Sequence, residues 1–197
     1  MKDSRYSGPL DMLENKPSKP PMSALDWFYE LAAIAGVAAG IIIVAANYTS
    51  LPDRIPTHFN AAGKVNGTGP KETLFILPIL SVFMYAMLTV LTRFPNLYNY
   101  PFRLREGERM YLYPIGRSMA LLLKAETVWL FFTITQATVW VATQKTSTFN
   151  PLVMYLSLVV ILVTMLFYIW LLFQAHKRYI PPTETTEADP DTGININ

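Results

Sequence analysis

The chain has 197 residues, of which 52% are hydrophobic and 15% are charged, whereas about 25% of the residues of a typical soluble domain are charged. This deficit of charge excludes an ordinary soluble domain and favours a protein of the lipid bilayer. With 16 basic and 14 acidic residues the net charge is only +2, so nucleic acid is not expected as a partner. The absence of cysteine excludes disulfides, thiolate nucleophiles and cysteine-ligated metal sites.

The apolar residues are concentrated in four long blocks, at about 26–48, 72–93, 118–142 and 151–175. Each block reaches the roughly 20 residues that a helix needs to cross the hydrocarbon core, and none alternates in polarity like a barrel strand. The sequence therefore predicts an all-α integral membrane protein, a four-transmembrane-helix bundle with a structured loop between helices 1 and 2. The membrane domain covers 26–178. The polar segments 1–25 and 179–197, the second of them acidic, are predicted to be disordered tails.

The distribution of basic residues predicts the orientation, because short loops rich in lysine and arginine stay in the cytoplasm. Eleven basic residues lie in the N-terminal tail, the second loop and the C-terminal flank, against four in the first and third loops. We therefore expect a multi-pass protein of the inner (plasma) membrane with cytoplasmic N- and C-termini. The first loop, 51–71, is then expected on the opposite side.

The first loop reads LPDRIPTHFNAAGKVNGTGPK and is the most informative part of the sequence. Its prolines favour extended backbone and its glycines permit tight turns. Such a loop holds its polar side chains in fixed directions; these are Asp53, Arg54, His58, Asn60 and Lys71. Two interpretations stay open. The side chains either bind a partner or satisfy the backbone of a loop that is folded over the helix ends.

These residues carry a resemblance to a known family. The residues concerned are Leu51-Pro52, Ile55-Pro56, His58-Phe59-Asn60, Gly63 and Lys71. Together they resemble the hallmark of a bacterial membrane domain of unknown function, which also forms the N-terminal part of the SdpI-like immunity proteins against the sporulation-delaying peptide toxin. A second patch is similar to members that hold this domain in a small four-span protein; it comprises Phe94-Pro95-Asn96, Asn99-Tyr100-Pro101 and Leu123-Lys124-x-Glu126. The family often carries an acidic residue where this chain has Asn66.

Three ionisable residues are predicted within the spans: Glu30, Lys124 and Glu126. Such residues are costly in hydrocarbon and are therefore functional candidates. Because Glu30 and Lys124 lie at similar depth, they either pair with each other or Lys124 extends alone to the interface. Glu126 also shares one helical face with Thr133 and Gln136, and this polar stripe is expected to face the bundle interior, as interhelical hydrogen bonds or as a path for protons or solutes.

Two further patterns concern contacts between helices and at the surface. Ala32, Gly36 and Gly40 form a row of small residues that serves packing within the bundle or a homo-oligomer through Gly36 and Gly40. The second loop, 94–117, combines aromatic residues with a basic group, which includes Arg103, Arg105 and Arg109. Such a loop suits the anionic inner membrane surface or the docking of a soluble partner.

No catalytic motif is recognised, and no cofactor or metal site is expected. The leading hypothesis is a non-enzymatic membrane protein resembling the SdpI-like family, whose loop caps the bundle and binds a peptide toxin, a lipid or a membrane-protein partner. One alternative is a small proton-coupled transporter or channel that uses Glu30, Lys124 and Glu126. Another is an accessory subunit of a larger membrane complex.

Overall fold

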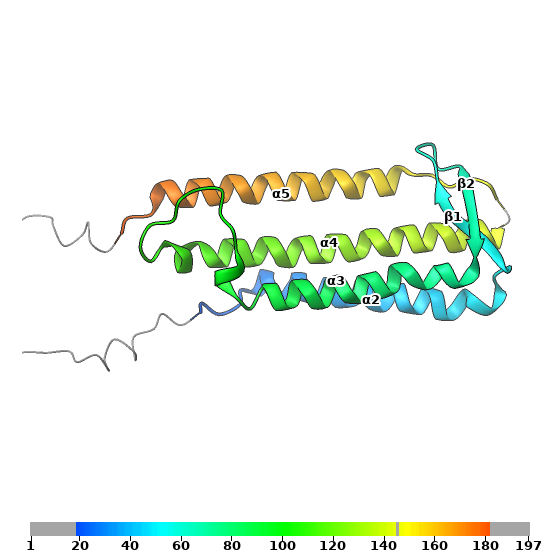
Figure 1. The fold of residues 1–197 in the computed structure, drawn as a ribbon, viewed down its shortest axis with the longest axis horizontal. Helices are drawn as coiled ribbons and strands as arrows, with labels where there is room; N and C mark the ends of the chain where they lie inside the picture. The colour runs from blue at the N-terminus through cyan, green and yellow to red at the C-terminus, as the bar shows by residue number, and fades with distance from the viewer. Residues whose placement is uncertain (1–18, 145, 182–197) are drawn as a thin grey trace, which may run out of the picture.

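The computed structural model describes residues 19–144 and 146–181, so most of both predicted tails lies outside the described residues. Four long helices lie side by side (Figure 1), and these are α2 (Ala24–Asn47), α3 (Ile76–Leu91), α4 (Glu108–Gln144) and α5 (Leu152–Arg178). The helix α4 packs against each of the other three, and α5 packs mainly against α4. The predicted helical bundle is therefore confirmed, with α4 as its central helix.

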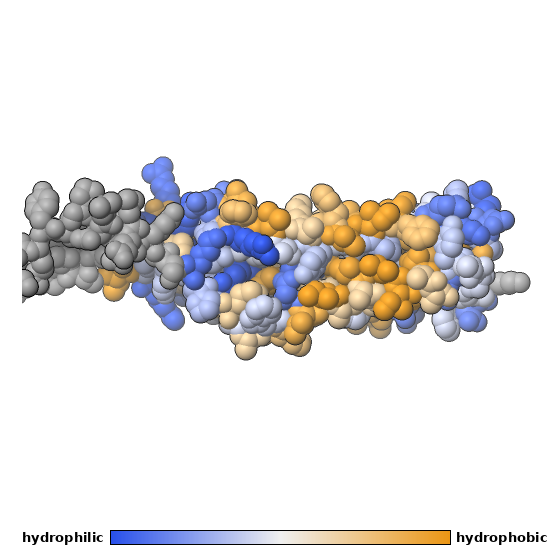
Figure 2. Space-filling view, turned by 90° about the horizontal axis from the view of Figure 1, so that it is seen from below, coloured by the Kyte–Doolittle hydropathy of each residue, from blue (hydrophilic) through white to orange (hydrophobic). Residues whose placement is uncertain are grey.

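In the described part of the chain, four helical segments are long and apolar enough to cross a membrane. The shortest, Lys71–Leu91, has 21 residues, or roughly 30 Å at about 1.5 Å per residue, which matches the thickness of the hydrocarbon core. Figure 2 shows a band of hydrophobic side chains across the middle of the molecule, with hydrophilic side chains at both ends. The chain is thus a multi-pass membrane protein.

Two helices begin before the positions predicted from hydropathy. Ser23 caps α2 in a reciprocal capping box with Asp26, so the helix begins at Ala24. The helix α4 begins at Glu108 rather than at about 118, and so includes the end of the predicted second loop. The physical reason is that hydropathy locates the edge of the hydrocarbon, whereas a helix continues beyond it wherever its polar turns find partners.

The structured loop between the first two membrane helices is a β-hairpin. Strand β1 (Arg54–Phe59) pairs antiparallel with β2 (Val65–Pro70), and a short 3-10 helix, η2 (Lys71–Phe75), leads into α3. The pairing register shifts between Pro56 and His58, so Thr57 has no partner on β2 and forms a bulge. The hairpin lies across one end of the bundle, opposite the end that carries both termini of the described chain (Figure 1).

A cluster of buried side chains fixes the hairpin to the bundle, and its members are Val44, Leu51, Ile55, Leu74, Val139 and Ala142. On the outer side, the turn of the hairpin hydrogen-bonds to the segment before α5. The N–H of Phe149 donates to the carbonyl oxygen of Gly63 at 3.0 Å, and the N–H of Val65 donates to that of Ser147 at 2.9 Å. The hairpin is therefore held from both sides and forms a fixed cap.

Gly63 is required where the hairpin turn meets this segment. Its φ is +73°, and a Cβ atom at this position would lie 2.2 Å from the carbonyl oxygen of Phe149. A larger residue at position 63 would thus have an unfavourable backbone conformation and would clash with the Phe149 carbonyl oxygen.

Candidate functional site

Asn60 organises the turn of the hairpin. Its side-chain oxygen accepts hydrogen bonds from the N–H groups of Ala62 and Lys64, both at 3.0 Å. For Asn60 the structural interpretation is therefore confirmed, because its side chain satisfies the backbone of its own loop.

Of the other polar residues predicted on the loop, Asp53, Arg54 and His58 are exposed and Lys71 is half-buried. His58 contacts the side chain of Asn66 on β2 through its Nδ1 atom, and both residues are exposed. Arg54 donates to the carbonyl oxygen of Thr68 at 3.2 Å. Lys71 and Asp53 form an ion pair of 3.4 Å, in which the Asp53 side chain is 96% exposed, so it contributes little to stability. The hairpin thus presents both charges and hydrogen-bonding groups to its surroundings.

A groove of about 320 Å³ runs beside β1, between the beginning of α3 and the C-terminal part of α4. Its walls are mainly apolar side chains, including Ile55, Phe59 and Ile134, and they also carry the hydroxyl groups of Thr57 and Thr138. Thr57, which the bulge leaves without a partner on β2, is among the residues that line this groove. Within the described residues, β1 pairs with β2 alone, so its second edge has no strand partner.

The predicted ion pair within the membrane is present. The Nζ atom of Lys124 lies 2.6 Å from an Oε atom of Glu30, and the Lys124 side chain is completely buried. Lys124 also donates to Thr89 at 3.0 Å and lies 4.4 Å from the centre of the Tyr85 ring. The hydroxyl of Tyr85 donates in turn to Glu30. The pair therefore joins α2, α3 and α4, and Lys124 does not extend alone to the interface.

A second buried ion pair was not predicted. Arg117 of α4 lies 3.0 Å from Asp26 of α2, and both side chains are at most 7% exposed. The Arg117 guanidinium also donates to the carbonyl oxygens of Pro20 and Pro21 at 2.7 Å. These contacts fix the segment before α2, which had been assigned to the tail. Only the proximity of Arg117 to the edge of a predicted span could have suggested this role.

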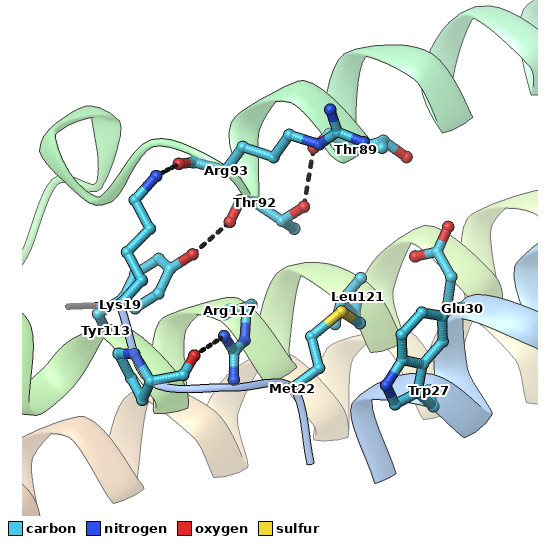
Figure 3. Close-up of a pocket in the computed structure, with 11 residues that line it drawn as sticks. Lys19, Met22, Trp27, Glu30, Thr89, Thr92, Arg93, Tyr113, Arg117 and Leu121 are labelled. Carbon is cyan, nitrogen blue, oxygen red and sulfur yellow. Dashed lines mark hydrogen bonds between the residues drawn. The ribbon is translucent and has the colours of Figure 1, made fainter. Parts of the chain in front are cut away.

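Beside this ion pair lies a cavity of about 430 Å³, shown in Figure 3. Three basic residues, Lys19, Arg93 and Arg117, line it together with Glu30 and Trp27. Lys124 and Glu126 do not line it. The cavity thus reaches one of the three ionisable residues predicted within the spans.

The predicted polar stripe on α4 does not face the interior as a unit. Gln136 is exposed, and the hydroxyl of Thr133 bonds to the carbonyl oxygen of Trp129 on its own helix. Glu126 is instead joined to α5, because one of its carboxyl oxygens accepts a hydrogen bond from Thr164 at 2.6 Å. The prediction was wrong because periodicity gives the face of a helix on which residues lie, but not which neighbour covers that face.

The two glycines of the small-residue row differ in environment. A Cβ atom on Gly36 would lie 2.8 Å from the Val128 side chain of α4, whereas one on Gly40 would have no neighbour within 4 Å. The row therefore serves packing of α2 on α4 at Gly36. This position is not available for the homo-oligomer contact considered from the sequence.

Two of the three predicted basic-loop arginines are engaged within the fold. Arg105 donates to the carbonyl oxygen of His176 at 2.8 Å, and Arg109 donates to those of Pro95 and Tyr98 at 3.3 and 3.2 Å. Arg103 is exposed. These bonds fix the loop between α3 and α4 against the end of α5.

A buried contact between Glu108 and His176 holds the same region together. Glu108 is fully buried, and its carboxylate lies 2.6 Å from the Nδ1 atom of His176. The ring of Phe102 stacks on that of His176 with 4.0 Å between the ring centres. In residues 19–144 and 146–181, no group of three His, Cys, Asp or Glu side chains could hold a metal ion.

Comparison with known protein families identifies a domain in the part of the chain that contains the hairpin. Residues 35–82 match the family described as Domain of unknown function (DUF1648). The matched range contains most of α2, the whole hairpin and the first part of α3. It includes the first patch of the resemblance but not the second patch, nor Lys124 and Glu126. The chain is therefore a multi-pass membrane protein that carries a DUF1648 domain, and the hairpin is the centre of that domain.

An uncharacterized protein from Archaeoglobus fulgidus is 32% identical over 78 residues, which cover 32% of this chain and 43% of that protein. The match thus spans less than half the length of this distant relative. No solved structure matches the chain.

Proposed function

We propose that the hairpin end of this protein binds a membrane-active peptide and that the protein acts in immunity, in the manner of the SdpI-like proteins that its first loop resembles. The observation that carries this proposal is the groove beside β1. Most of its lining belongs to the DUF1648 domain and one wall to α4, and here a strand whose second edge has no strand partner in the described chain meets an apolar surface at the end of the membrane helices.

The groove has the properties that an amphipathic peptide would need. Apolar side chains of such a peptide would pack on Ile134 and Phe59, and its backbone would find an unpaired strand edge in β1. The exposed polar groups of His58 and Arg54 lie on the same strand and would contact polar parts of the peptide. Because the hairpin is held by a buried cluster and by the segment 147–149, little ordering would accompany binding.

The basic residues support an orientation with this end outside the cytoplasm. Both described termini lie at the opposite end of the bundle, where the arginine-containing loop also lies (Figure 1). In this orientation the hairpin meets a toxin that arrives from outside.

Two matched substitutions test the proposal in toxin-sensitive bacteria. Thr57 and Thr68 are both exposed threonines of the hairpin, but only Thr57 lines the groove. Cells that express the wild-type chain should survive the sporulation-delaying peptide, Thr57→Trp should abolish survival by filling the groove, and Thr68→Trp should preserve it at equal protein levels. Survival of cells that carry Thr57→Trp would exclude the groove as the peptide-binding site. Death of cells that carry the wild type would exclude immunity to this peptide.

The transporter alternative draws support from one observation, since Glu30 lines the cavity of about 430 Å³. Glu126, however, lies on a different groove from this cavity. A transporter would therefore use the Glu30–Lys124 pair without Glu126. Proton flux into vesicles containing the purified protein, lost in Glu30→Gln, would favour this alternative.

A further inference from the structure

A second groove, of about 370 Å³, lies on the surface of α4 between α2 and α5. Glu126 is the one acidic residue among its lining side chains. One of its carboxyl oxygens accepts the hydrogen bond from Thr164, whereas the other, Oε2, is buried and has no hydrogen-bond partner among the described residues. A buried carboxyl oxygen without a hydrogen-bond partner costs free energy, so a ligand that supplies a partner there would gain binding free energy.

Within residues 19–144 and 146–181, no basic side chain lines this groove. Lys124 is only two residues away on α4, but it is completely buried and bound to Glu30. A carboxylate within a membrane span is expensive unless it has a counter-charge. The groove therefore lacks a positive charge, which either a proton or a cationic ligand can supply.

The walls of the groove suit a cation that is also apolar. Three aromatic residues line it: Phe28 and Tyr29 from α2 and Trp129 from α4. The indole N–H of Trp129 donates to the carbonyl oxygen of Ala32 at 3.0 Å, which fixes the orientation of the ring. Aromatic faces attract cations and are the usual binding surface for quaternary ammonium groups.

The remaining walls connect the groove with the lipid. Leu156, Val153 and Val160 of α5 are apolar and more than half exposed on the outer surface of the helices. Phe28 is 64% exposed. A hydrophobic compound dissolved in the bilayer would thus reach the groove without crossing the protein.

We propose that this groove binds a small lipophilic cation, whose positive charge lies beside the Glu126 carboxylate and whose apolar groups lie between α2 and α5. Its volume falls within the range of about 300–1,000 Å³ that is usual for small-molecule sites. This site is separate from the groove beside β1 and does not depend on the function proposed for the hairpin.

Equilibrium dialysis of the purified full chain in detergent micelles tests this inference with two probes of equal shape and opposite charge. Tetraphenylphosphonium should bind saturably, and tetraphenylborate, dialysed separately, should not. Glu126→Gln should weaken the binding of tetraphenylphosphonium at least tenfold. Glu72→Gln is the matched control, because Glu72 is an acidic residue that does not line this groove, and its affinity should stay within about twofold of the wild type.

Phe28→Leu provides a variant on the exposed wall that does not alter the carboxyl group, and it should weaken binding at least threefold. The inference is overturned if tetraphenylphosphonium does not bind saturably, because a proton alone then satisfies Glu126. It is also overturned if tetraphenylborate binds equally well, or if both Glu126→Gln and Phe28→Leu keep the wild-type affinity.

Discussion

Neutralising Glu30 and Lys124 singly and together gives a quantitative prediction for the buried ion pair. The Lys124 side chain is fully buried and the Glu30 side chain is 14% exposed. Removal of one partner from a buried pair usually costs about 3–5 kcal/mol, because the other charge stays unpaired. The joint removal of both charges costs much less, since no unpaired charge is left behind.

The side chains around the pair determine how much free energy of unfolding each variant should lose. In Lys124→Met, Glu30 keeps the hydroxyl of Tyr85 as its one hydrogen-bond partner among the described side chains, so we expect a loss of about 3 kcal/mol. In Glu30→Gln, the new amide oxygen can still accept a hydrogen bond, and Lys124 keeps Thr89 and the Tyr85 ring; we expect a loss of about 2 kcal/mol. The double variant should lose only about 1–2 kcal/mol, so the two single losses together should exceed the loss of the double variant by about 3–4 kcal/mol.

The assay is equilibrium unfolding of the four proteins in mixed micelles, followed by circular dichroism. The exposed pair of Asp53 and Lys71 serves as the control, and its own double-mutant cycle should show little coupling. If the losses for Glu30 and Lys124 add without coupling, the two side chains do not stabilise each other, and the argument from burial is refuted.

Three further predictions concern the hairpin, the loop before α4 and the orientation. Gly63→Ala should raise amide hydrogen exchange throughout the hairpin, because the new Cβ atom would clash with the carbonyl oxygen of Phe149. The control Gly40→Ala should leave this exchange unchanged, and equal exchange in both variants would contradict the predicted clash. Burial raises the pKa of the Tyr98 hydroxyl above its ordinary value of 10.0, so the wild type should lose stability as the pH rises past about 10. Tyr98→Phe removes this buried hydroxyl, which has no partner among the described residues, and should lose less stability over the same pH range in unfolding experiments. The same loss of stability in both proteins would refute this prediction. Because the chain has no cysteine, Lys64→Cys gives a single thiol that an impermeant reagent should label in intact cells, and labelling only after the membrane is opened would invert the orientation.

Much of the fold could be predicted from the sequence, because the requirement for about 20 apolar residues per span is strict. The hairpin was predicted only as a structured loop. Its strands lack the alternation of apolar and polar residues that identifies a half-buried strand, since β2 reads VNGTGP. Its conformation depends on long-range contacts instead, such as that between Gly63 and Phe149.

Of the buried polar contacts, the one between Glu30 and Lys124 could be predicted from the sequence, whereas those of Arg117 and Glu108 could not. Glu30 and Lys124 could be paired because both lie within spans at similar depth, so their positions along the membrane are known from counting alone. The partners of Arg117 and Glu108 could not be predicted, because loops and helix ends have no such fixed scale. The direction in which Gln136 points was also wrong, because periodicity gives the face of a helix but not the neighbour that covers it.

The central claim, that the hairpin end binds a membrane-active peptide, is tested most directly by photocross-linking in cells. A photoreactive benzoylphenylalanine placed at position 57, in the groove, should capture the added sporulation-delaying peptide, and the same group at position 68, outside the groove, should capture much less. Excess unlabelled peptide should suppress the capture at position 57. Absence of capture at position 57, or equal capture at both positions, would contradict the proposed site.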